Sequence, residues 1–272
     1  MKTERLYNKD DNVSMKFNDK IIIMEGTMKA VISILMVFLC FSFIWAQEEV
    51  NIEATSVEFE QGLDLEAVGE LFKDSENLEE FEKSLNDPDT GINNLDLDGN
   101  NEVDFIRVLE EVEDDLHLII LQAALEEEEY QDVAIIEIEK NENDSYTMQI
   151  QGNEDIYGSD YFIAPAEVRI HTWPIIKRIY HPAYHPYRSP YYWGRYPQWW
   201  RRHAPVKIHV YKPRIKKYTV RAHFVFTRKN RIKHIHRLHY KPRRAAIFKQ
   251  RRIHRNQAVR KAHPVPKRVK RK

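Results

Sequence analysis

The sequence is almost without cysteine. Its single cysteine, Cys40, lies in the apolar run at residues 30–46, so a chain processed after that run would have no thiol and no disulfide. Stability must therefore come from packing or from bound ions.

The sequence also lacks the motifs that mark common enzyme classes. There is no HExxH, no glycine-rich phosphate loop, no cysteine nucleophile and no Ser/His/Asp order. The abundant carboxylates give no sign of a matched acid and base. We therefore expect a protein that is not an enzyme.

Acidic residues are missing from the C-terminal part of the chain, where Glu167 is the last carboxylate. Residues 168–272 hold 32 Lys and Arg, whereas residues 48–167 hold 37 Asp and Glu against 4 Lys and Arg. This segregation predicts two modules that meet different partners or each other. The compensating anions are nucleic-acid phosphate, anionic lipid or polysaccharide, or the acidic domain of the same or another copy.

The chain has a single long apolar run, and this run has the layout of a signal peptide. Lys29 precedes residues 30–46, and polar residues follow them. We expect a leader over 1–46, a start at Met28 and cleavage after Ala46. An uncleaved anchor is the alternative, because 17 apolar residues are the lower limit for a bilayer core of about 30 Å. In both cases the remainder is predicted to be exported to the periplasm, the outer envelope or the extracellular medium.

Residues 47–167 have the pattern of an acidic α+β domain. Apolar residues recur at helical spacing from 65 to 72 and from 78 to 85, and Asp74 and Ser75 are candidate caps for the second segment. Period-two alternation then predicts strands at 103–109, 116–122, 132–139 and 146–151. Short polar connections favour an antiparallel meander, so we expect two short helices packed on a small antiparallel sheet.

One motif carries recognisable chemistry. The loop at 96–104 places side-chain oxygens at relative positions 1, 3, 5 and 9, and position 7 can offer its carbonyl. Calcium takes six to eight oxygen ligands, and this spacing lets one tight loop surround a single ion. Asn101 stands where glycine commonly makes the sharp turn, and asparagine tolerates that left-handed conformation. The candidate calcium ligands are Asp96, Asp98, Asn100, Glu102 and Asp104.

This loop resembles the calcium loop of EF-hands, with one departure. Position 12 is Arg107 in place of a bidentate glutamate, and a strand pattern follows in place of a helix. The loop is therefore more similar to the Asp-rich, strand-leading calcium loops of extracellular β repeats. That resemblance implies a structural ion bound weakly, with a Kd of roughly 10⁻⁴ to 10⁻³ M. The other interpretation is a turn rich in Asp, Asn and Gly that binds nothing.

Three more runs are distinctive: SLNDPDTGINNLDLDGNNEVDFIRVLE, QDVAIIEIEK and YRSPYYWG. In these runs the chain resembles an uncharacterised family of exported bacterial proteins. The resemblance implies that residues 60–165 form one unit, and it implies no activity.

The basic part divides into two segments. Residues 168–205 are rich in proline and aromatic side chains, so we expect them to pack in an extended form on a surface. Residues 206–272 form a basic region in which a hairpin is expected before a disordered tail. Within it, alternation predicts strands at 207–211, 218–226 and 232–240, and the tail begins at 241.

Eleven of the twelve histidines lie in this basic part. The spacing of His181 with His185, and of His234, His236 and His239, suits zinc or copper, but neither group has Cys or carboxylate support. The alternative is that these histidines only add positive charge in acid.

These features favour an exported binding or structural module that is not an enzyme. We expect Ca²⁺ to stabilise it, and its basic aromatic tail to attach it to anionic lipid or polysaccharide of the cell envelope. The alternative is a nucleic-acid-binding protein that uses the basic C-terminal half and stacks aromatic and Arg side chains on bases. Self-association through acidic-to-basic contacts is a third interpretation.

Overall fold

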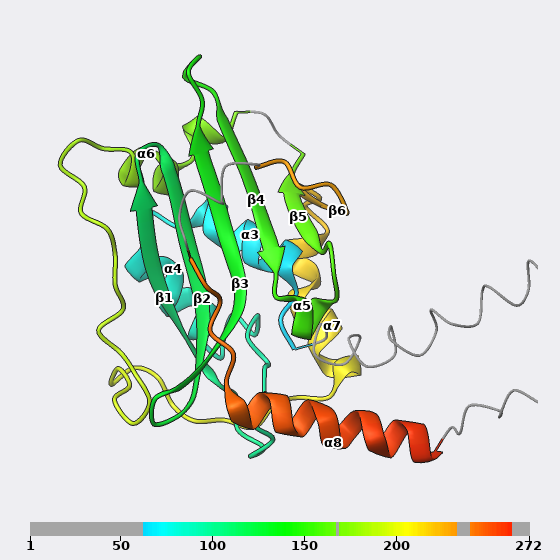
Figure 1. Cartoon of the computed structure of the whole chain (residues 1–272). Coiled ribbons are helices and arrows are strands. Elements are labelled where there is room, and N and C mark those ends of the chain that lie inside the picture. The colour runs from blue at the N-terminus through cyan, green and yellow to red at the C-terminus, as the bar shows by residue number, and fades with distance from the viewer. Residues whose placement is uncertain (1–61, 167–168, 233–239, 263–272) are drawn as a thin grey trace, which may run out of the picture. The chain divides into compact units, whose positions relative to one another are not determined.

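The structure, a computed structural model, describes residues 62–166, 169–232 and 240–262 (Figure 1). These residues form a mixed α+β fold, in which helices accompany a six-stranded antiparallel sheet. The predicted fold class is therefore confirmed at this level. The leader expected at 1–46 lies outside the described residues, as does most of the strand expected at 232–240.

Two helices confirm the helical spacing of the acidic half. They are α3 (Leu65–Asp74) and α4 (Leu78–Asn86). The Asp64 carboxylate accepts backbone N–H groups at the start of α3, and the Asn77 side chain does so at the start of α4. The cap of α4 is thus Asn77, beyond the predicted residues 74–75, because its short side chain reaches the N–H three residues ahead.

The strands follow one another in sequence order across the sheet. They are β1 (Phe105–Glu113), β2 (Leu116–Glu126), β3 (Glu129–Lys140), β4 (Tyr146–Gly152), β5 (Phe162–Pro165) and β6 (Phe224–Thr227). The first four confirm the predicted meander. After the short helix α5 (Glu154–Tyr157), β5 pairs with β6, which comes from the basic half.

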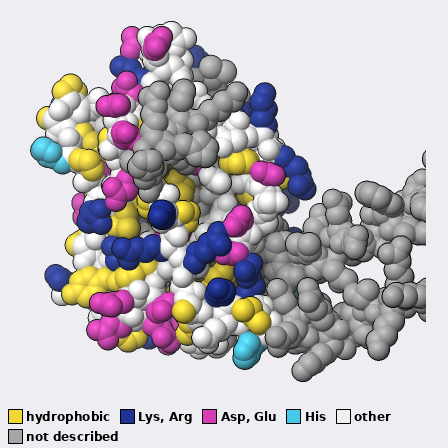
Figure 2. Space-filling model, in the orientation of Figure 1, with side chains coloured by type: hydrophobic (Ala, Val, Ile, Leu, Met, Phe, Trp, Pro, Cys, Tyr) yellow, Lys and Arg dark blue, Asp and Glu magenta, His cyan; other side chains and the backbone are white. Residues whose placement is uncertain are grey.

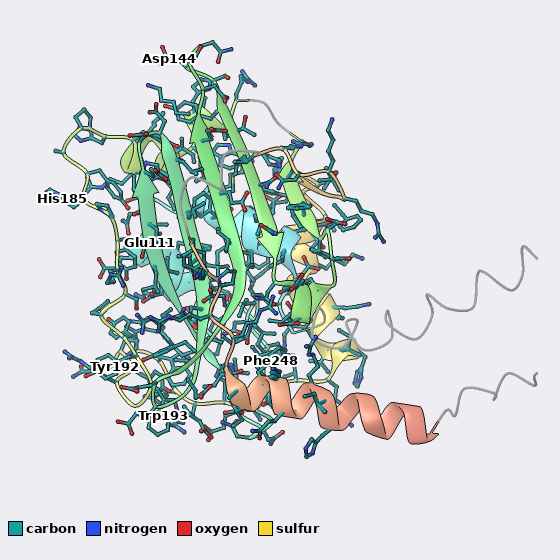
Figure 3. All side chains as sticks on the ribbon, viewed as in Figure 1. Glu111, Asp144, His185, Tyr192, Trp193 and Phe248 are labelled. Atoms are coloured by element: carbon teal, nitrogen blue, oxygen red, sulfur yellow. The ribbon has the colours of Figure 1, made fainter. Side chains whose placement is uncertain are left out.

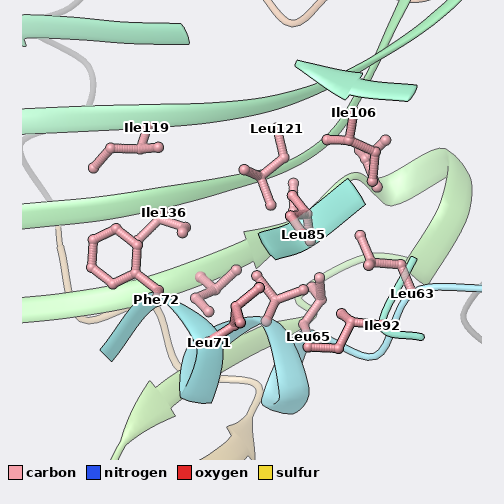
Figure 4. Close-up of a cluster of buried hydrophobic side chains, with 14 of the residues drawn as sticks. Leu63, Leu65, Leu71, Phe72, Leu85, Ile92, Ile106, Ile119, Leu121 and Ile136 are labelled. Atoms are coloured by element: carbon pink, nitrogen blue, oxygen red, sulfur yellow. The ribbon is translucent and has the colours of Figure 1, made fainter. Parts of the chain in front are cut away.

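Helices lie behind the sheet in Figure 1, and the segment before α8 crosses in front of it. The larger core cluster lies on the helix side (Figure 4) and includes Phe72, Leu85, Ile119, Leu121 and Ile136. The opposite side, the front face, carries a smaller apolar cluster. Its buried members are Leu109, Leu116, Leu118, Ile120, Ile135 and Ile232. Strands β2 and β3 are buried on both faces, which accounts for their long apolar runs.

The basic half completes the fold. Its described helices are η1 (Ile170–Thr172), α6 (Pro174–Ile179), α7 (Ile208–Thr219) and α8 (Ala246–Ala262). The strand predicted at 207–211 is wrong, because buried Tyr211, Ile215 and Tyr218 recur at helical spacing and α7 packs on α3. Of the strand predicted at 218–226, the last residues fall within β6.

The tail expected to be disordered from 241 instead contains α8. Phe248 at its start is 1% exposed and belongs to the larger core cluster. Arg252 pairs with Asp155 at 2.7 Å, and Arg244 pairs with Glu154. The disorder prediction depended on few apolar residues and dense charge, and burial of Phe248 together with these counter-charges compensates for both.

Opposite charges from the two halves meet within one chain. The positive charge of the basic half was predicted to need compensating anions, and the acidic half of the same chain supplies several of them. Exposed ion pairs contribute only about 0–1 kcal/mol each, so they align the halves more than they hold them together. The pairs include Arg188–Glu111, Arg202–Glu102, Arg221–Asp74, Arg251–Asp96 and Arg252–Asp155.

Candidate binding surface and acidic loop

The acidic loop, residues 96–104, joins the helical part to β1 and is folded by its own side chains. Asp96 Oδ1 accepts the Gly99 N–H at 2.6 Å, and its Oδ2 accepts the Asn101 N–H at 3.2 Å. Asn101 has a φ of 66°, the left-handed conformation expected for its position. Asp98 in turn accepts the Asn100 N–H at 2.9 Å. The turn has the predicted local form.

Asp104 is the buried member of the loop, 5% exposed, and its Oδ2 accepts the Leu97 N–H at 2.6 Å. Burial raises the pKa of Asp104 well above its usual range, and repulsion from Asp98 and Asp96 raises it further. The charges of Asp96 and Asp98, two other candidate ligands, therefore act on the acidity of Asp104. A bound cation would relieve that repulsion.

A guanidinium already contacts the acidic loop. Arg251 of α8 donates to the Asp96 carbonyl, and its Nη1 lies 3.4 Å from Asp96 Oδ1. Within the described ranges, no three His, Cys, Asp or Glu side chains are gathered as a metal site. Asn100 Nδ2 donates to Asp98 Oδ2 at 2.9 Å and Asn100 Oδ1 accepts the Glu102 N–H at 2.7 Å, while the Glu102 carboxylate pairs with Arg202.

The aromatic segment, residues 191–202, packs on β1 through Phe105. The rings of Tyr191, Tyr196, Trp199 and Trp200 lie with their centroids 5.4–6.4 Å from that of Phe105. Three rings of the segment are exposed, and one of them, Trp199, also contacts Phe105. Tyr192 is 45% exposed, Trp193 39% and Trp199 37%, and Figure 3 shows Tyr192 and Trp193 at the lower edge of the molecule.

Arginine side chains accompany these exposed rings. The Arg195 guanidinium lies 5.6 Å from the Tyr192 ring centroid, and that of Arg202 lies 5.7 Å from the Tyr196 ring centroid. Arg201, which lies between Arg195 and Arg202 in the sequence, is also exposed. The aromatic segment therefore carries exposed apolar rings and exposed positive charge within twelve residues, with Arg195 beside the exposed Tyr192 ring.

The acidic loop and the aromatic segment are joined directly. Val103 N–H donates to the His203 carbonyl at 2.8 Å. The Arg202 guanidinium pairs with Glu102 at 2.8 Å. The position of the aromatic segment therefore depends on the loop that carries the candidate calcium ligands.

Sequence reasoning missed a set of buried carboxylates that hold the basic half in place. Glu82, 1% exposed, accepts the Val108 N–H at 2.6 Å and the Ser189 hydroxyl at 3.0 Å. Glu110, 3% exposed, accepts the Tyr187 N–H at 2.8 Å and lies 2.6 Å from His117 Nδ1.

Two further carboxylates act in the same way. Asp132 accepts the Arg243 N–H at 2.7 Å, and Glu70 accepts the His223 N–H at 3.1 Å. Because these bonds reach backbone groups, they fix the path of the basic half more firmly than the surface ion pairs do.

Burial changes the acidity of several of these groups. It raises the pKa of Glu82 to about 7, although the Val108 N–H and Ser189 oppose the rise. It also raises the pKa of Glu137 on β3 to about 7, against the effect of a hydrogen bond from Gln149.

Among the described residues, the candidate metal-binding histidines do not form part of a group of three or more His, Cys, Asp or Glu side chains. His181 and His185 are both exposed, and His181 Nδ1 accepts the Ala183 N–H at 3.1 Å. His234, His236 and His239 lie outside the described residues.

Among the described helices, none has the length and apolar character needed to span a bilayer. Comparison with known proteins gave no match to a family model, to a curated protein or to a solved structure.

Proposed function

We propose that this chain is an exported binding module that attaches to an anionic component of the cell envelope through the aromatic segment. It acts without catalysis, and calcium at the acidic loop stabilises it. The anionic component is lipid or polysaccharide, with an anionic lipid surface as the first candidate.

The observation that carries the proposal is the exposure of Tyr192, Trp193 and Trp199 beside Arg195 and Arg201. Tyr and Trp favour the interface between water and lipid because each combines an apolar ring with a polar group. Arginine adds attraction to anionic headgroups. Part of the positive charge of the basic half already pairs with carboxylates of the same chain, which favours a local surface over a free polycationic arm; the paired side chains are Arg188, Arg202, Arg221, Arg244, Arg251 and Arg252.

The export part of the proposal depends on the leader pattern at residues 30–46. The nucleic-acid alternative depends on the same exposed rings and arginines, which could stack on bases. Binding of single-stranded DNA in preference to anionic vesicles would favour that alternative.

Replacement of Trp193 or Trp199 by Ala should weaken binding to phosphatidylglycerol vesicles. The exposed part of each ring could bury about 60–95 Å², worth roughly 1.5–2.5 kcal/mol, so each change should cost about tenfold or more in affinity. Vesicle sedimentation with a chain that begins at Gln47 measures this without the apolar run at 30–46. Phosphatidylcholine vesicles test whether binding needs the negative charge of the lipid. Alginate tests whether an anionic polysaccharide binds in place of lipid.

Phe226→Ala is the matched control, because Phe226 is 46% exposed but lies on β6. This variant should bind vesicles as the parent chain does. Equal binding by the parent and both Trp variants would contradict the proposed surface.

Calcium titration of the full chain by calorimetry should give a Kd of roughly 10⁻⁴ to 10⁻³ M. Asp98→Asn should weaken binding. Arg251→Met should tighten it several-fold, because the change removes a cation that contacts Asp96. Arg252→Met is the control, since Arg252 pairs with Asp155 instead. Absence of binding heat in the parent chain and in Arg251→Met would remove calcium from the proposal.

A further inference from the structure

Three arginine side chains lie on the front face of the sheet, and two of them share one aromatic ring. Arg107 of β1 and Arg243 both lie over the Tyr130 ring, with distances to its centroid of 4.8 and 5.7 Å. The backbone of Arg188 pairs with Leu109, which places its side chain on the same face as Arg107. Figure 2, which views this face, shows Lys and Arg side chains gathered across its lower half.

Positive charge at this place is incompletely balanced. Burial lowers the pKa of Arg107, and repulsion from Arg243 and Arg188 contributes to that lowering. Glu111 is paired with Arg188 at 3.1 Å, and Asp132 accepts the backbone N–H of Arg243. In the part of the chain that the structure describes, no carboxylate pairs with the guanidinium of Arg107 or Arg243.

Hydrogen-bonding capacity beneath these cations is also unused. Among described residues, Arg107 Nε and Gln122 Oε1 are buried atoms without a hydrogen-bond partner. Arg107 and Gln122 face each other across β1 and β2, so both side chains lie on the front face. Gln122 Nε2 donates to Asp132 Oδ1 at 2.6 Å, which fixes the amide orientation because a carboxylate only accepts. Of the two, the Arg107 Nε–H is the donor that an oxyanion can satisfy, whereas Gln122 Oε1 accepts and needs a protonated oxygen on the ligand; unpaired buried polar atoms are rare in folded proteins.

We propose that Arg107, Arg188 and Arg243 form an oxyanion site that takes the phosphate group of a ligand. Guanidinium groups donate in a planar fork that matches phosphate oxygens. Phosphate is preferred over a carboxylate because its second charge compensates more of the repulsion among three cations. The site lies on the sheet and not on the aromatic segment, so it goes beyond the function proposed above and does not depend on it.

The test uses the full chain and inorganic phosphate as the probe. The Nε–H resonance of Arg107 should shift saturably during an NMR titration. Arg107→Gln and Arg243→Gln, followed through backbone amides nearby, should each lower the affinity about tenfold, as expected for loss of a charge-assisted hydrogen bond. Arg228→Gln is the control, because Arg228 is exposed and lies 6.0 Å from the Phe226 centroid, away from Tyr130. Urea midpoints verify that each variant is folded.

Competition identifies the source of the phosphate. Displacement of inorganic phosphate by phosphatidylglycerol vesicles, but not by phosphatidylcholine vesicles, would identify a lipid headgroup. Saturable phosphate binding without displacement would identify a soluble phosphate or phosphate ester, and both results support the site. Wild-type phosphate affinity in both variants, or no saturable binding in the parent chain, would overturn it. Trp193 and Trp199 are unchanged in the arginine variants. The proposed lipid-binding role of the aromatic segment is therefore tested separately from the oxyanion site.

Discussion

A chain that ends at Glu167 is expected to lose cooperative folding, although it contains the whole acidic domain predicted from the sequence. Burial of a large apolar side chain contributes roughly 1.5–3 kcal/mol, and the typical net stability of a domain is only about 5–15 kcal/mol. Loss of the basic half removes more than that margin. Its contribution to the larger core cluster includes Ile170, Trp173, Ile175, Ile176, Ile179, Tyr211, Ile215, Tyr218, Phe224 and Phe248.

Urea unfolding followed by circular dichroism measures this effect, because the shortened chain has no tryptophan beyond the leader. The expected result is a broad transition with a reduced m-value, together with binding of the dye ANS. A chain that ends at His254 is the control, since it keeps Phe248 in the core and the pairs of Arg251 and Arg252, and it should unfold as the full chain does. A sharp urea transition in the chain that ends at Glu167 would contradict the role assigned to the basic half.

Glu137→Gln should stabilise the protein at pH 8 by about 3 kcal/mol and change it little near pH 5. Glu137 is fully buried, and within the described residues its Oε1 has no hydrogen-bond partner. Burial raises its pKa from 4.5 to about 7, so the folded state keeps a proton that the unfolded state has released. Below pH 4.5 Glu137 is protonated in both states and does not lower the free energy of unfolding. As the pH rises from 4.5 through 7, the unfolded state releases the proton more readily and the folded state loses stability relative to it. Gln keeps the contact with Gln149 without ionising.

The measurement is the free energy of unfolding in urea at several pH values between 5 and 8.5. The parent chain should become less stable as the pH rises in this range, and Glu82 contributes in the same direction because its pKa is also about 7. Glu142→Gln is the control, because Glu142 is exposed and near the same end of the sheet. Parallel pH curves for Glu137→Gln and the parent would exclude this explanation.

Local patterns were sufficient to predict α3, α4 and the first four strands, because each repeats its period within one segment. They were insufficient for β6, which has four residues and depends on pairing with β5 about sixty residues earlier. They were also insufficient for α7, whose short alternation at 207–211 competes with a helical repeat. The helical repeat consists of Tyr211, Ile215 and Tyr218. Packing of α7 on α3 favours the helix over the strand, and this packing is not visible in the local sequence.

The acidic loop could be predicted because its candidate ligands lie within nine residues. The contacts of the aromatic segment and the arginine site could not, since they join residues roughly one hundred positions apart. The buried carboxylates did leave a signal. Glu82 occupies the apolar stripe formed by Leu78, Phe81 and Leu85, and Glu110 shares its face of β1 with Val108. Because the segment contains so many acidic residues, composition alone could not distinguish these two buried glutamates from the solvent-exposed ones.

The long separation of the bonded partners governs how the molecule can fold after synthesis. Arg251 contacts Asp96 across 155 positions, and His223 contacts Glu70 across 153. A ribosome that adds about 5–20 residues per second needs roughly 5–20 s to make the basic half after the acidic half has emerged. Until then Glu82 lacks the Ser189 hydroxyl, Glu110 lacks the Tyr187 N–H, and the basic half does not yet cover the sheet. Folding should therefore be slow and largely post-translational, with a strong dependence on holdase chaperones.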